Sequence, residues 1–429
     1  MKTFFIETYG CQMNVSDSEA ISGILASAGY LSVDDIENAD LIIVNTCAVR
    51  DTAVSKVKAQ ICRFKPLRNR KKIKIAVAGC LAEHEGESLL KDLPIDYVIG
   101  PDRYKFLSEL EGGVRVSVSS TDDENGFYSG FSPVRKKGVN TWVQVMRGCD
   151  NFCSYCVVPY VRGRERSKPS KDIIREIEGV VSEGFPEVTL LGQNVNSYKD
   201  GDLRFHDLLR HIDKIKGLKR VRFMTSHPKD LSDDLINCFG ELSTLCEYLH
   251  LPVQSGSDKI LAAMNRGYTN KDYRLLIDKI RKRVPSIALS TDILSGFPGE
   301  SDEDHALTLQ LVKDIGYDAG FMFIYSKRKG TKAASMEEQL KREIKVARVN
   351  EIINVQMEIT KAKNSQCIGN IEEVIVEGVS PRNPSKITAR TRTFKNVILD
   401  GTASEVGSFL TVRVTGSTGW ALEGEREGV

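Results

Sequence analysis

The chain has 429 residues, of which 41% are hydrophobic and 28% are charged, and its formal net charge is +2 at pH 7. A chain of this length forms two or three domains with a substantial core. The small net charge excludes attraction to nucleic acid over the whole surface, so any RNA contact has to be local. No apolar run approaches the roughly 18 residues of a transmembrane helix, and residues 1–7 hold too short an apolar run for a signal peptide. We therefore predict a cytoplasmic protein that binds no membrane and keeps its ten cysteines reduced.

The first 120 residues repeat one pattern three times, a short apolar strand followed by a cysteine. Helical segments separate the strands, and the first helix is predicted to start at a capping box of Ser16 and Glu19 and to end at Gly29. This alternation predicts an open parallel α/β sheet over residues 1–120. The predicted strands are residues 3–8, 41–45 and 73–78, and the cysteines that follow them are Cys11, Cys47 and Cys80.

These three cysteines are candidate metal ligands. Open parallel sheets bind ligands at the carboxyl ends of their strands, so the three thiols are predicted to converge although they are distant in sequence. Because the chain also contains a second cysteine triad, described below, we predict that they bind an iron–sulfur cluster. Buried free thiols are the alternative. The cysteines without such an arrangement are predicted to be ordinary thiols: Cys62, Cys238, Cys246 and Cys367.

Residues 121–138 are polar and rich in turn-forming residues, which predicts a linker. From residue 139 to residue 366, six strand-like runs alternate with helical segments and predict a partial (β/α)6 barrel. The runs cover residues 142–146, 188–191, 221–224, 248–251, 288–293 and 319–325. Short polar segments follow the strands at the face where such barrels keep their active sites. They include residues 192–194, 226–228, 252–256 and 295–300.

The segment after the first barrel strand carries three cysteines within eight residues, Cys149, Cys153 and Cys156. Three thiolates on one tight loop can hold three irons of a 4Fe-4S cluster and leave the fourth iron open to a ligand. Zinc is the alternative, but zinc sites use paired cysteines with two-residue gaps and fill four positions. Since the next cysteine is the distant Cys238, the spacing favours an iron–sulfur cluster.

A long helical pattern covers residues 340–364, and short β-branched runs separated by glycines follow it. They predict a small antiparallel β-barrel over residues 367–429, with strands at residues 373–377, 387–392, 397–399 and 409–414. A charged edge strand that prevents aggregation would explain the basic residues of this part. The alternative that we favour is a phosphate-binding patch for RNA, made of Lys386, Arg390, Arg392 and Lys395.

Cys149, Cys153 and Cys156, with Tyr155 before the last cysteine, resemble the signature of radical S-adenosylmethionine (radical SAM) enzymes. The segments Tyr-Gly-Cys-Gln-Met-Asn (9–14), Asn-Thr-Cys-Ala-Val-Arg (45–50) and Ala-Gly-Cys (78–80) resemble the N-terminal domain of methylthiotransferases. Residues 367–429 resemble a TRAM domain, which binds RNA. The order of the three parts is similar to that of the tRNA methylthiotransferases.

This resemblance implies two 4Fe-4S clusters, one on each cysteine triad, and SAM bound at the Cys149 cluster with Tyr155 and Gln193 among its contacts. It implies methylthiolation of carbon 2 of N6-isopentenyladenosine at position 37, next to the anticodon of a tRNA stem-loop. Two SAM molecules, an electron donor and a sulfur source are implied as well. The nearest alternative is a relative that acts on N6-threonylcarbamoyladenosine or on a ribosomal protein. An alternative of a different class is a non-catalytic iron–sulfur regulator that binds RNA.

Overall fold

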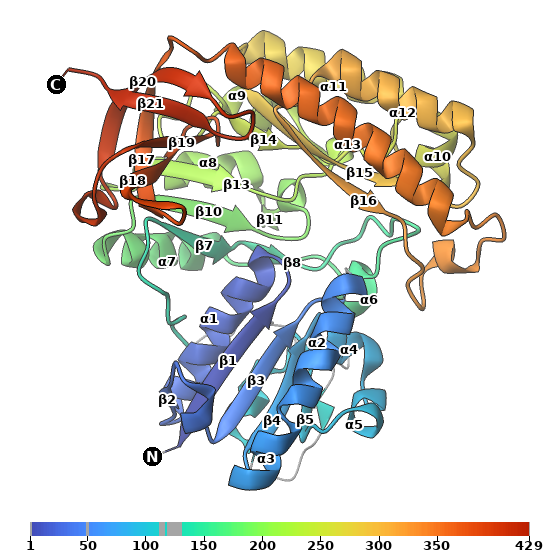
Figure 1. The fold of residues 1–429 in the computed structure, drawn as a ribbon, viewed down its shortest axis with the longest axis vertical. Helices are drawn as coiled ribbons and strands as arrows, with labels where there is room; N and C mark the ends of the chain where they lie inside the picture. Colours follow the sequence, from blue (N-terminus) through green and yellow to red (C-terminus); the bar gives the residue numbers. More distant parts are fainter. Residues whose placement is uncertain (1, 49–50, 111–115, 118–130, 429) are drawn as a thin grey trace.

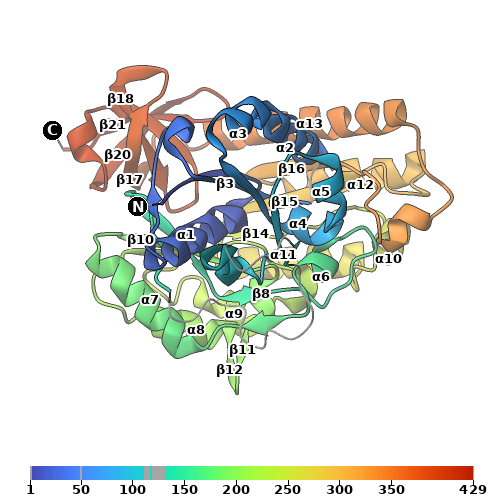
Figure 2. The same ribbon diagram turned by 90° about the horizontal axis from the view of Figure 1, so that it is seen from below.

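The computed structural model describes residues 2–48, 51–110, 116–117 and 131–428. Three parts follow one another along the chain: an α/β part at one end of the molecule, and a barrel-like part and a small β-barrel that lie side by side at the other end (Figures 1 and 2). Of the predicted linker, residues 121–130 lie outside the described residues, and residues 131–138 contain no helix or strand. The predicted order of an α/β sheet, a partial barrel and a small β-barrel is confirmed.

The N-terminal part is a six-stranded parallel sheet with the order β2-β1-β3-β4-β5-β6. Its elements are β1 (Thr3–Tyr9), α1 (Gln12–Ser27), β2 (Leu31–Ser32), β3 (Leu41–Thr46), α2 (Asp51–Arg63), α3 (Lys65–Lys71), β4 (Lys74–Gly79), α4 (Cys80–Glu85), α5 (Ser88–Asp92), β5 (Tyr97–Ile99) and β6 (Val116–Ser117). The central strands β3 and β4 are apolar runs buried on both faces, as parallel strands require. Helix α1 covers one face through Ile21 and Ile24, and α2 covers the other through Val57 and Ile61.

The predicted start of the first helix is wrong. Helix α1 begins at Gln12 with Cys11 as its N-cap, and Ser16 is buried within the helix. The turn before the helix is tight, because a Cβ on Gly10 would lie 2.8 Å from the Cβ of Cys47. The chain therefore enters α1 directly after β1, and Cys11 lies at the amino end of the helix.

Six parallel strands form the central part, as two sheets with the orders β13-β10-β7 and β14-β15-β16. One parallel bridge between Val221 and Leu245 joins the sheets, so the predicted partial barrel of six units is confirmed. Its elements are β7 (Asn140–Gln144), β8 (Met146–Arg147), α6 (Val158–Val161), β9 (Arg166–Ser167), α7 (Ser170–Ser182), β10 (Glu187–Leu191), β11 (Lys199–Asp200), β12 (Leu203–Arg204), α8 (Phe205–Ile212), β13 (Arg220–Phe223), α9 (Asp233–Cys238), β14 (Tyr248–His250), α10 (Asp258–Ala263), α11 (Asn270–Arg283), β15 (Ala288–Ser295), α12 (Asp302–Ile315) and β16 (Ala319–Ile324).

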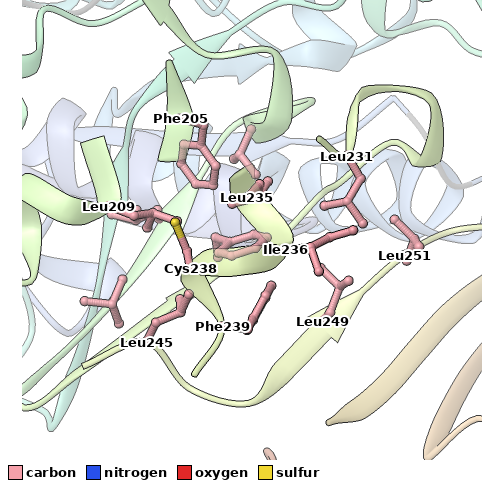
Figure 3. Close-up of a cluster of buried hydrophobic side chains, with 14 of the residues drawn as sticks. Phe205, Leu209, Leu231, Leu235, Ile236, Cys238, Phe239, Leu245, Leu249 and Leu251 are labelled. Carbon is pink, nitrogen blue, oxygen red and sulfur yellow. The ribbon is translucent and has the colours of Figure 1, made fainter. Parts of the chain in front are cut away.

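The core of the central part lies between the strands and the outer helices. Figure 3 shows where α8 and α9 pack together, with Phe205 and Leu209 near Leu235. Cys238 is fully buried in this cluster and its thiol donates to the backbone carbonyl of Asp234 at 3.3 Å. This environment is that of an ordinary core thiol.

A long helix, α13 (Arg342–Ser365), leads to a closed barrel with the order β17-β18-β19-β21-β20. The strands are β17 (Ile371–Ser380), β18 (Asn383–Thr391), β19 (Asn396–Asp400), β20 (Phe409–Ser417) and β21 (Leu422–Arg426). The predicted small antiparallel barrel is confirmed, with one parallel pairing, between β19 and β21. Five strands cannot close a barrel with strictly alternating directions. None of the helices in the described part of the chain, α13 included, is long and apolar enough to cross a membrane.

The C-terminal barrel packs against the amino ends of the central strands. Arg220, the first residue of β13, is buried and its guanidinium donates to the carbonyl of Arg390 at 2.8 Å. Arg222 donates in the same way to the carbonyl of Arg392 at 2.7 Å. The ring of Phe394 stacks on Tyr248 with centroids 4.6 Å apart. The carboxyl ends of the central strands, at the opposite end, face the N-terminal part instead.

Candidate active site

The loop that carries Cys149, Cys153 and Cys156 follows β7 at the carboxyl ends of the central strands. The short strands β8 and β9 pair antiparallel and close its base. Gly148 has a φ of +77°, and a Cβ there would lie 1.9 Å from the carbonyl oxygen of Arg164, so only glycine fits. The start of the cysteine loop is therefore fixed against the end of this hairpin.

Each thiol of the loop has a nitrogen donor within hydrogen-bonding distance of its sulfur. The distances are 3.6 Å from Asn151 Nδ2 to Cys149, 3.3 Å from Arg266 Nη1 to Cys153 and 3.4 Å from the backbone nitrogen of Val158 to Cys156. Hydrogen bonds of this kind orient thiolate ligands and tune the reduction potential of a cluster. Burial raises the pKa of Cys149 to about 11 and that of Cys156 to about 12, so metal binding here would release protons.

Side chains from other loops hold the cysteine loop in place. The hydroxyl of Ser154 donates to the carbonyl of Ala263 at 2.7 Å, and Asn265 donates to the carbonyl of Phe152 at 3.1 Å. Gln193 accepts a hydrogen bond from the backbone nitrogen of Gly148 at 2.6 Å. Its carbonyl oxygen therefore fastens the loop, a role that the resemblance did not indicate.

Tyr155, the second predicted SAM contact, lies half-buried between Cys153 and Cys156 in sequence. It packs against a small apolar cluster at the carboxyl end of the barrel, formed by Ile260, Met264, Phe297, Tyr325 and Ala333. The tyrosine therefore belongs to the wall of the site.

The N-terminal thiols lie at the ends of three adjacent strands, β1, β3 and β4. Tyr9, Thr46 and Gly79 are register partners across these strands. Cys11, Cys47 and Cys80 follow these three residues by two, one and one positions, so the strand ends bring the thiols to one edge of the sheet.

The N-terminal thiols differ in exposure and in pKa. Cys47 and Cys80 are buried, whereas Cys11 is exposed. The hydrogen bond to Cys47 lowers the pKa of Cys11 to about 6, and the charge of Arg162 and the backbone amides of Asn14 and Met13 contribute further. A thiol at a helix N-terminus beside a cation ionises readily and becomes a good metal ligand. Burial raises the pKa of Cys80.

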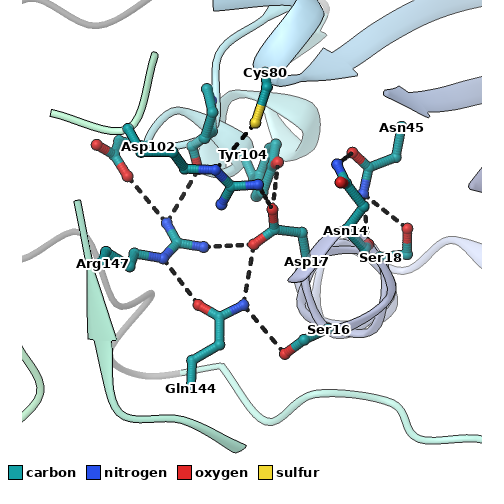
Figure 4. A network of polar contacts seen from close by, with 12 residues as sticks. Asn14, Ser16, Asp17, Ser18, Asn45, Cys80, Asp102, Tyr104, Gln144 and Arg147 are labelled. Carbon is teal, nitrogen blue, oxygen red and sulfur yellow. Dashed lines mark hydrogen bonds and ion pairs between the residues drawn. The ribbon is translucent and has the colours of Figure 1, made fainter. Parts of the chain in front are cut away.

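A buried polar network joins the N-terminal part to the central part, in the region between the two cysteine triads (Figure 4). Asp17 of α1 and Arg147 of β8 are fully buried, and their side chains form an ion pair at 2.6 Å. Arg147 also binds Asp102 at 3.0 Å, and Asp17 accepts a hydrogen bond from Gln144 at 3.0 Å. Arg162 adds a second ion pair to Asp17 at 2.7 Å and donates from Nε to the sulfur of Cys80 at 3.1 Å.

Apolar side chains next to the two triads also contact each other. Val157, which follows Cys156 directly, and Val161 pack in one cluster with Ala48 and Cys80. The segment after one triad thus touches the other triad. The two cysteine sets lie on the two sides of one interface.

Sequence reasoning missed the charged residues of this interface and of the loop: Asp17, Arg147, Arg162 and Arg266. Their partners come from distant segments, so no periodicity or spacing marks them. A charged residue within an otherwise apolar helical face, such as Asp17, was the one available signal.

The carboxyl ends of the central strands also carry buried polar atoms that have no hydrogen-bond partner within the described ranges. They are Asn194 Oδ1, Ser226 Oγ, His227 Nε2 and Ser295 Oγ. Burial lowers the pKa of His227 to about 2, with a contribution from Arg266, so its ring stays neutral. Because unsatisfied buried polar groups are rare, this set fits contact with a polar ligand such as SAM.

The four basic residues predicted to bind RNA do not form one open patch. Arg392 makes a bidentate ion pair with Glu247 of the central part, with the shorter contact at 2.7 Å. Lys395 binds Asp318 of the central part at 3.0 Å. Within the C-terminal barrel, Arg390 pairs with Glu377 at 2.8 Å and Lys386 with Asp400 at 3.1 Å. Two of the four therefore tie the C-terminal barrel to the central part.

The described residues contain no group of three or more His, Cys, Asp or Glu side chains that converges on the position of a single metal ion. The ligands of a cubane cluster need not converge in this way, because each thiolate binds a different iron. Three thiols at adjacent strand ends, and three on a tight loop with a nitrogen donor near each sulfur, fit cluster ligation.

Family models match the three parts of the chain. The radical SAM superfamily matches residues 143–312, the TRAM domain matches residues 365–426, and a family described as uncharacterized protein family UPF0004 matches residues 3–100. The partial barrel with its cysteine loop and these matches define a radical SAM protein with a TRAM domain.

Relatives over the full length narrow this class. A tRNA-2-methylthio-N(6)-dimethylallyladenosine synthase from Carboxydothermus hydrogenoformans is 46% identical over 434 residues, which cover 99% of each chain. A synthase of the same name from Clostridium tetani is 44% identical and covers 99% of this chain and 96% of its own. The chain belongs to the family of tRNA-2-methylthio-N(6)-dimethylallyladenosine synthases.

Solved structures share the fold at low sequence identity. The radical S-adenosylmethionine methyltransferase TsrM from Kitasatospora setae, with cobalamin and a 4Fe-4S cluster bound, has a TM-score of 0.60 at 14% identity and covers 78% of this chain and 74% of its own. The cobalamin-dependent S-adenosylmethionine radical enzyme OxsB has a TM-score of 0.52 at 11% identity and covers 83% of this chain and 56% of its own. This likeness concerns the fold alone.

Proposed function

We propose that the protein is an enzyme that adds a methylthio group to carbon 2 of N6-isopentenyladenosine, next to the anticodon of tRNA. The observation that carries the proposal is the position of two cysteine triads on the two sides of one interface. The name of the full-length relatives supports the substrate and the reaction. A cytoplasmic location, where tRNA is found, stays a prediction.

In this proposal Cys149, Cys153 and Cys156 hold one 4Fe-4S cluster, and Cys11, Cys47 and Cys80 hold a second. When bound, the two clusters and SAM supply reductive cleavage of SAM to a 5′-deoxyadenosyl radical, methyl transfer and the inserted sulfur. Each triad would leave one iron of its cluster without a cysteine ligand. This open iron suits the binding of SAM at the barrel cluster and the binding of sulfur at the N-terminal cluster.

The chain's own residues hold and orient these groups. The thiolates of the barrel loop accept hydrogen bonds from Asn151, Arg266 and the backbone nitrogen of Val158. Gln193, which follows β10, holds the start of the loop through the backbone nitrogen of Gly148. Tyr155 and the unsatisfied polar atoms of Asn194, Ser226, His227 and Ser295 are the candidate contacts of SAM. Nδ1 of the neutral His227 accepts a hydrogen bond from the backbone nitrogen of Lys229, so Nε2 carries the proton and can donate one hydrogen bond without adding charge beside the SAM sulfonium.

The C-terminal barrel is proposed to bind tRNA, and the TRAM match supports this role. Lys386 and Arg390 are the better candidates for phosphate contact, because Arg392 and Lys395 are engaged with the central part. The reaction also needs an electron donor and a sulfur source, which stay predictions.

Mass spectrometry of tRNA nucleosides after anaerobic turnover tests the proposal. The expected product is the 2-methylthio derivative of N6-isopentenyladenosine, with S-adenosylhomocysteine and 5′-deoxyadenosine as coproducts. A methylthio group found only on N6-threonylcarbamoyladenosine would overturn the substrate assignment. Absence of 5′-deoxyadenosine from active reconstituted protein would overturn the radical reaction.

Variants separate the two triads by step. A protein with Cys11→Ala, Cys47→Ala and Cys80→Ala should still form 5′-deoxyadenosine and should form no methylthio product. A protein with Cys149→Ala, Cys153→Ala and Cys156→Ala should form neither. Methylthiolated adenosine from the first variant would show that the N-terminal cysteines are structural thiols.

A further inference from the structure

One cation of the interface has a hydrogen-bonding group left over beside the N-terminal triad. Arg162 is only 3% exposed, and two of its three guanidinium nitrogens have partners. Nε donates to the sulfur of Cys80 at 3.1 Å, and Nη2 pairs with Asp17 at 2.7 Å. Nη1 is buried and has no hydrogen-bond partner among the described residues.

An unsatisfied guanidinium nitrogen in a buried site costs free energy unless a further acceptor is present when the protein is functional. A planar guanidinium whose Nε donates to Cys80 brings its positive charge next to whatever that sulfur binds. Cys47 and Cys80 are buried too, so a ligand of the triad meets Arg162 with little competition from water.

We propose that Arg162 is a positioning residue of the N-terminal site, which donates through Nε to the Cys80 ligand and places its positive charge beside the anionic sulfur held there. The proposal rests on the cluster assignment made under Proposed function. The anionic sulfur is either an inorganic sulfide of the cluster or a sulfur added to its open iron. Arg162 comes from the central part, six residues after Cys156, so the N-terminal site is complete only when the two parts are docked.

The expected effect is on the reduction potential. A cation and a hydrogen bond at cluster sulfur both stabilise the added electron, so their loss disfavours the reduced state. In Arg162→Gln, the equilibrium constant for one-electron reduction should fall about tenfold or more, which corresponds to a shift of about 59 mV to lower potential.

The test uses full-length protein in which Cys149, Cys153 and Cys156 are replaced by Ala, so that only the N-terminal site can hold a cluster. Arg162→Gln, Arg162→Lys and Arg147→Gln are introduced into this background. Arg147 is the matched control, because it is also buried and pairs with Asp17, and its guanidinium donates further to Gln144, the carbonyl of Pro101 and Asp102. Iron content, circular dichroism and redox titration by electron paramagnetic resonance are measured anaerobically, with and without added sodium sulfide.

The proposal is supported if the equilibrium constant for one-electron reduction falls tenfold or more in Arg162→Gln. The constant should fall less in Arg162→Lys, which keeps the charge, and should change less than threefold in Arg147→Gln. An effect without added sulfide assigns the contact to cluster sulfide, and an effect that needs sodium sulfide assigns it to the added sulfur. If Arg162→Gln does not fold, the lysine variant decides, and an unchanged constant there overturns the proposal.

If the equilibrium constant for reduction changed equally in Arg162→Gln and Arg147→Gln, or changed in neither, the proposal would be overturned. The cluster assignment would still stand. A background protein without iron would overturn the cluster assignment and this inference together. The two failures are therefore distinguishable.

Discussion

Replacing Asp17 by Asn should separate the N-terminal part from the central part at a lower denaturant concentration. Asp17 is fully buried and pairs with Arg147 at 2.6 Å and with Arg162 at 2.7 Å. Asn keeps the size of the side chain but removes the charge. Arg147 retains Asp102 at 3.0 Å, whereas Arg162 loses the one carboxylate that pairs with it in the described ranges.

The magnitude follows from this difference between the two arginines. Leaving one buried charge without its partner costs about 3–5 kcal/mol, and the retained Asp102 pair keeps the loss from doubling. Asp96→Asn is the matched control, because its partners Arg68 and Lys74 are 32% and 56% exposed and water can replace the lost charge. We expect the control to lose about 1 kcal/mol.

The assay is urea unfolding followed by the fluorescence of Trp142. The chain has two tryptophans, so a Trp420→Phe background leaves Trp142 in β7, the strand that packs against α1, as the sole reporter. A chain with several domains unfolds in more than one step, and this probe isolates the step at the interface. A midpoint for Asp17→Asn equal to that of Asp96→Asn would refute the reasoning.

The pH dependence gives a second check on the same pair. Burial alone would raise the pKa of Asp17, but the charges of Arg162 and Arg147 outweigh it and hold the pKa below its usual value. A carboxyl with a lowered folded-state pKa stabilises the protein above its unfolded-state pKa of about 3.9. The difference in the free energy of unfolding between wild type and Asp17→Asn should therefore have its full size at pH 7. It should shrink in acid, as the pH falls through the folded-state pKa of Asp17.

Three further outcomes are expected. Reconstituted protein should hold about eight irons, and replacing the three barrel cysteines by Ala should leave about four, because each triad holds its own cluster; an unchanged iron content would contradict this. Burial raises the pKa of Glu19 to about 7, so ionisation of this carboxyl lowers the stability of the folded protein as the pH rises from the usual pKa of Glu to 7. In thermal unfolding, Glu19→Gln should therefore be more stable than wild type by about 2–3 kcal/mol at pH 8 and equally stable near pH 4. Arg392→Ala should lower the stability of the docked C-terminal barrel by roughly 1–2 kcal/mol because it breaks the bidentate pair with Glu247; reduced tRNA affinity without lower stability would instead make Arg392 an RNA ligand.

The sequence by itself determined the features that depend on neighbours in the chain. The spacing of Cys149, Cys153 and Cys156 predicted a loop with three thiols, and hydrophobic periodicity predicted all six central strands. The strands before Cys11, Cys47 and Cys80 were predicted as well, because apolar β-branched runs carry their own signal. Among the missed strands, β2, β5 and β6 are two or three residues long, too short for any period to show, and β21 (Leu422–Arg426) has five residues, of which Leu422 alone is apolar and larger than glycine.

The tertiary structure alone decided which of these elements meet. The ion pairs of Asp17 with Arg147 and Arg162 join residues 130 and 145 positions apart, so they depend on how two domains dock and leave no trace in local pattern. The same holds for Arg392 and Lys395, which look like a basic patch in sequence but face Glu247 and Asp318 across a domain boundary. Burial and partner decide what a charged side chain does, and both are set by packing between segments that the sequence does not place side by side.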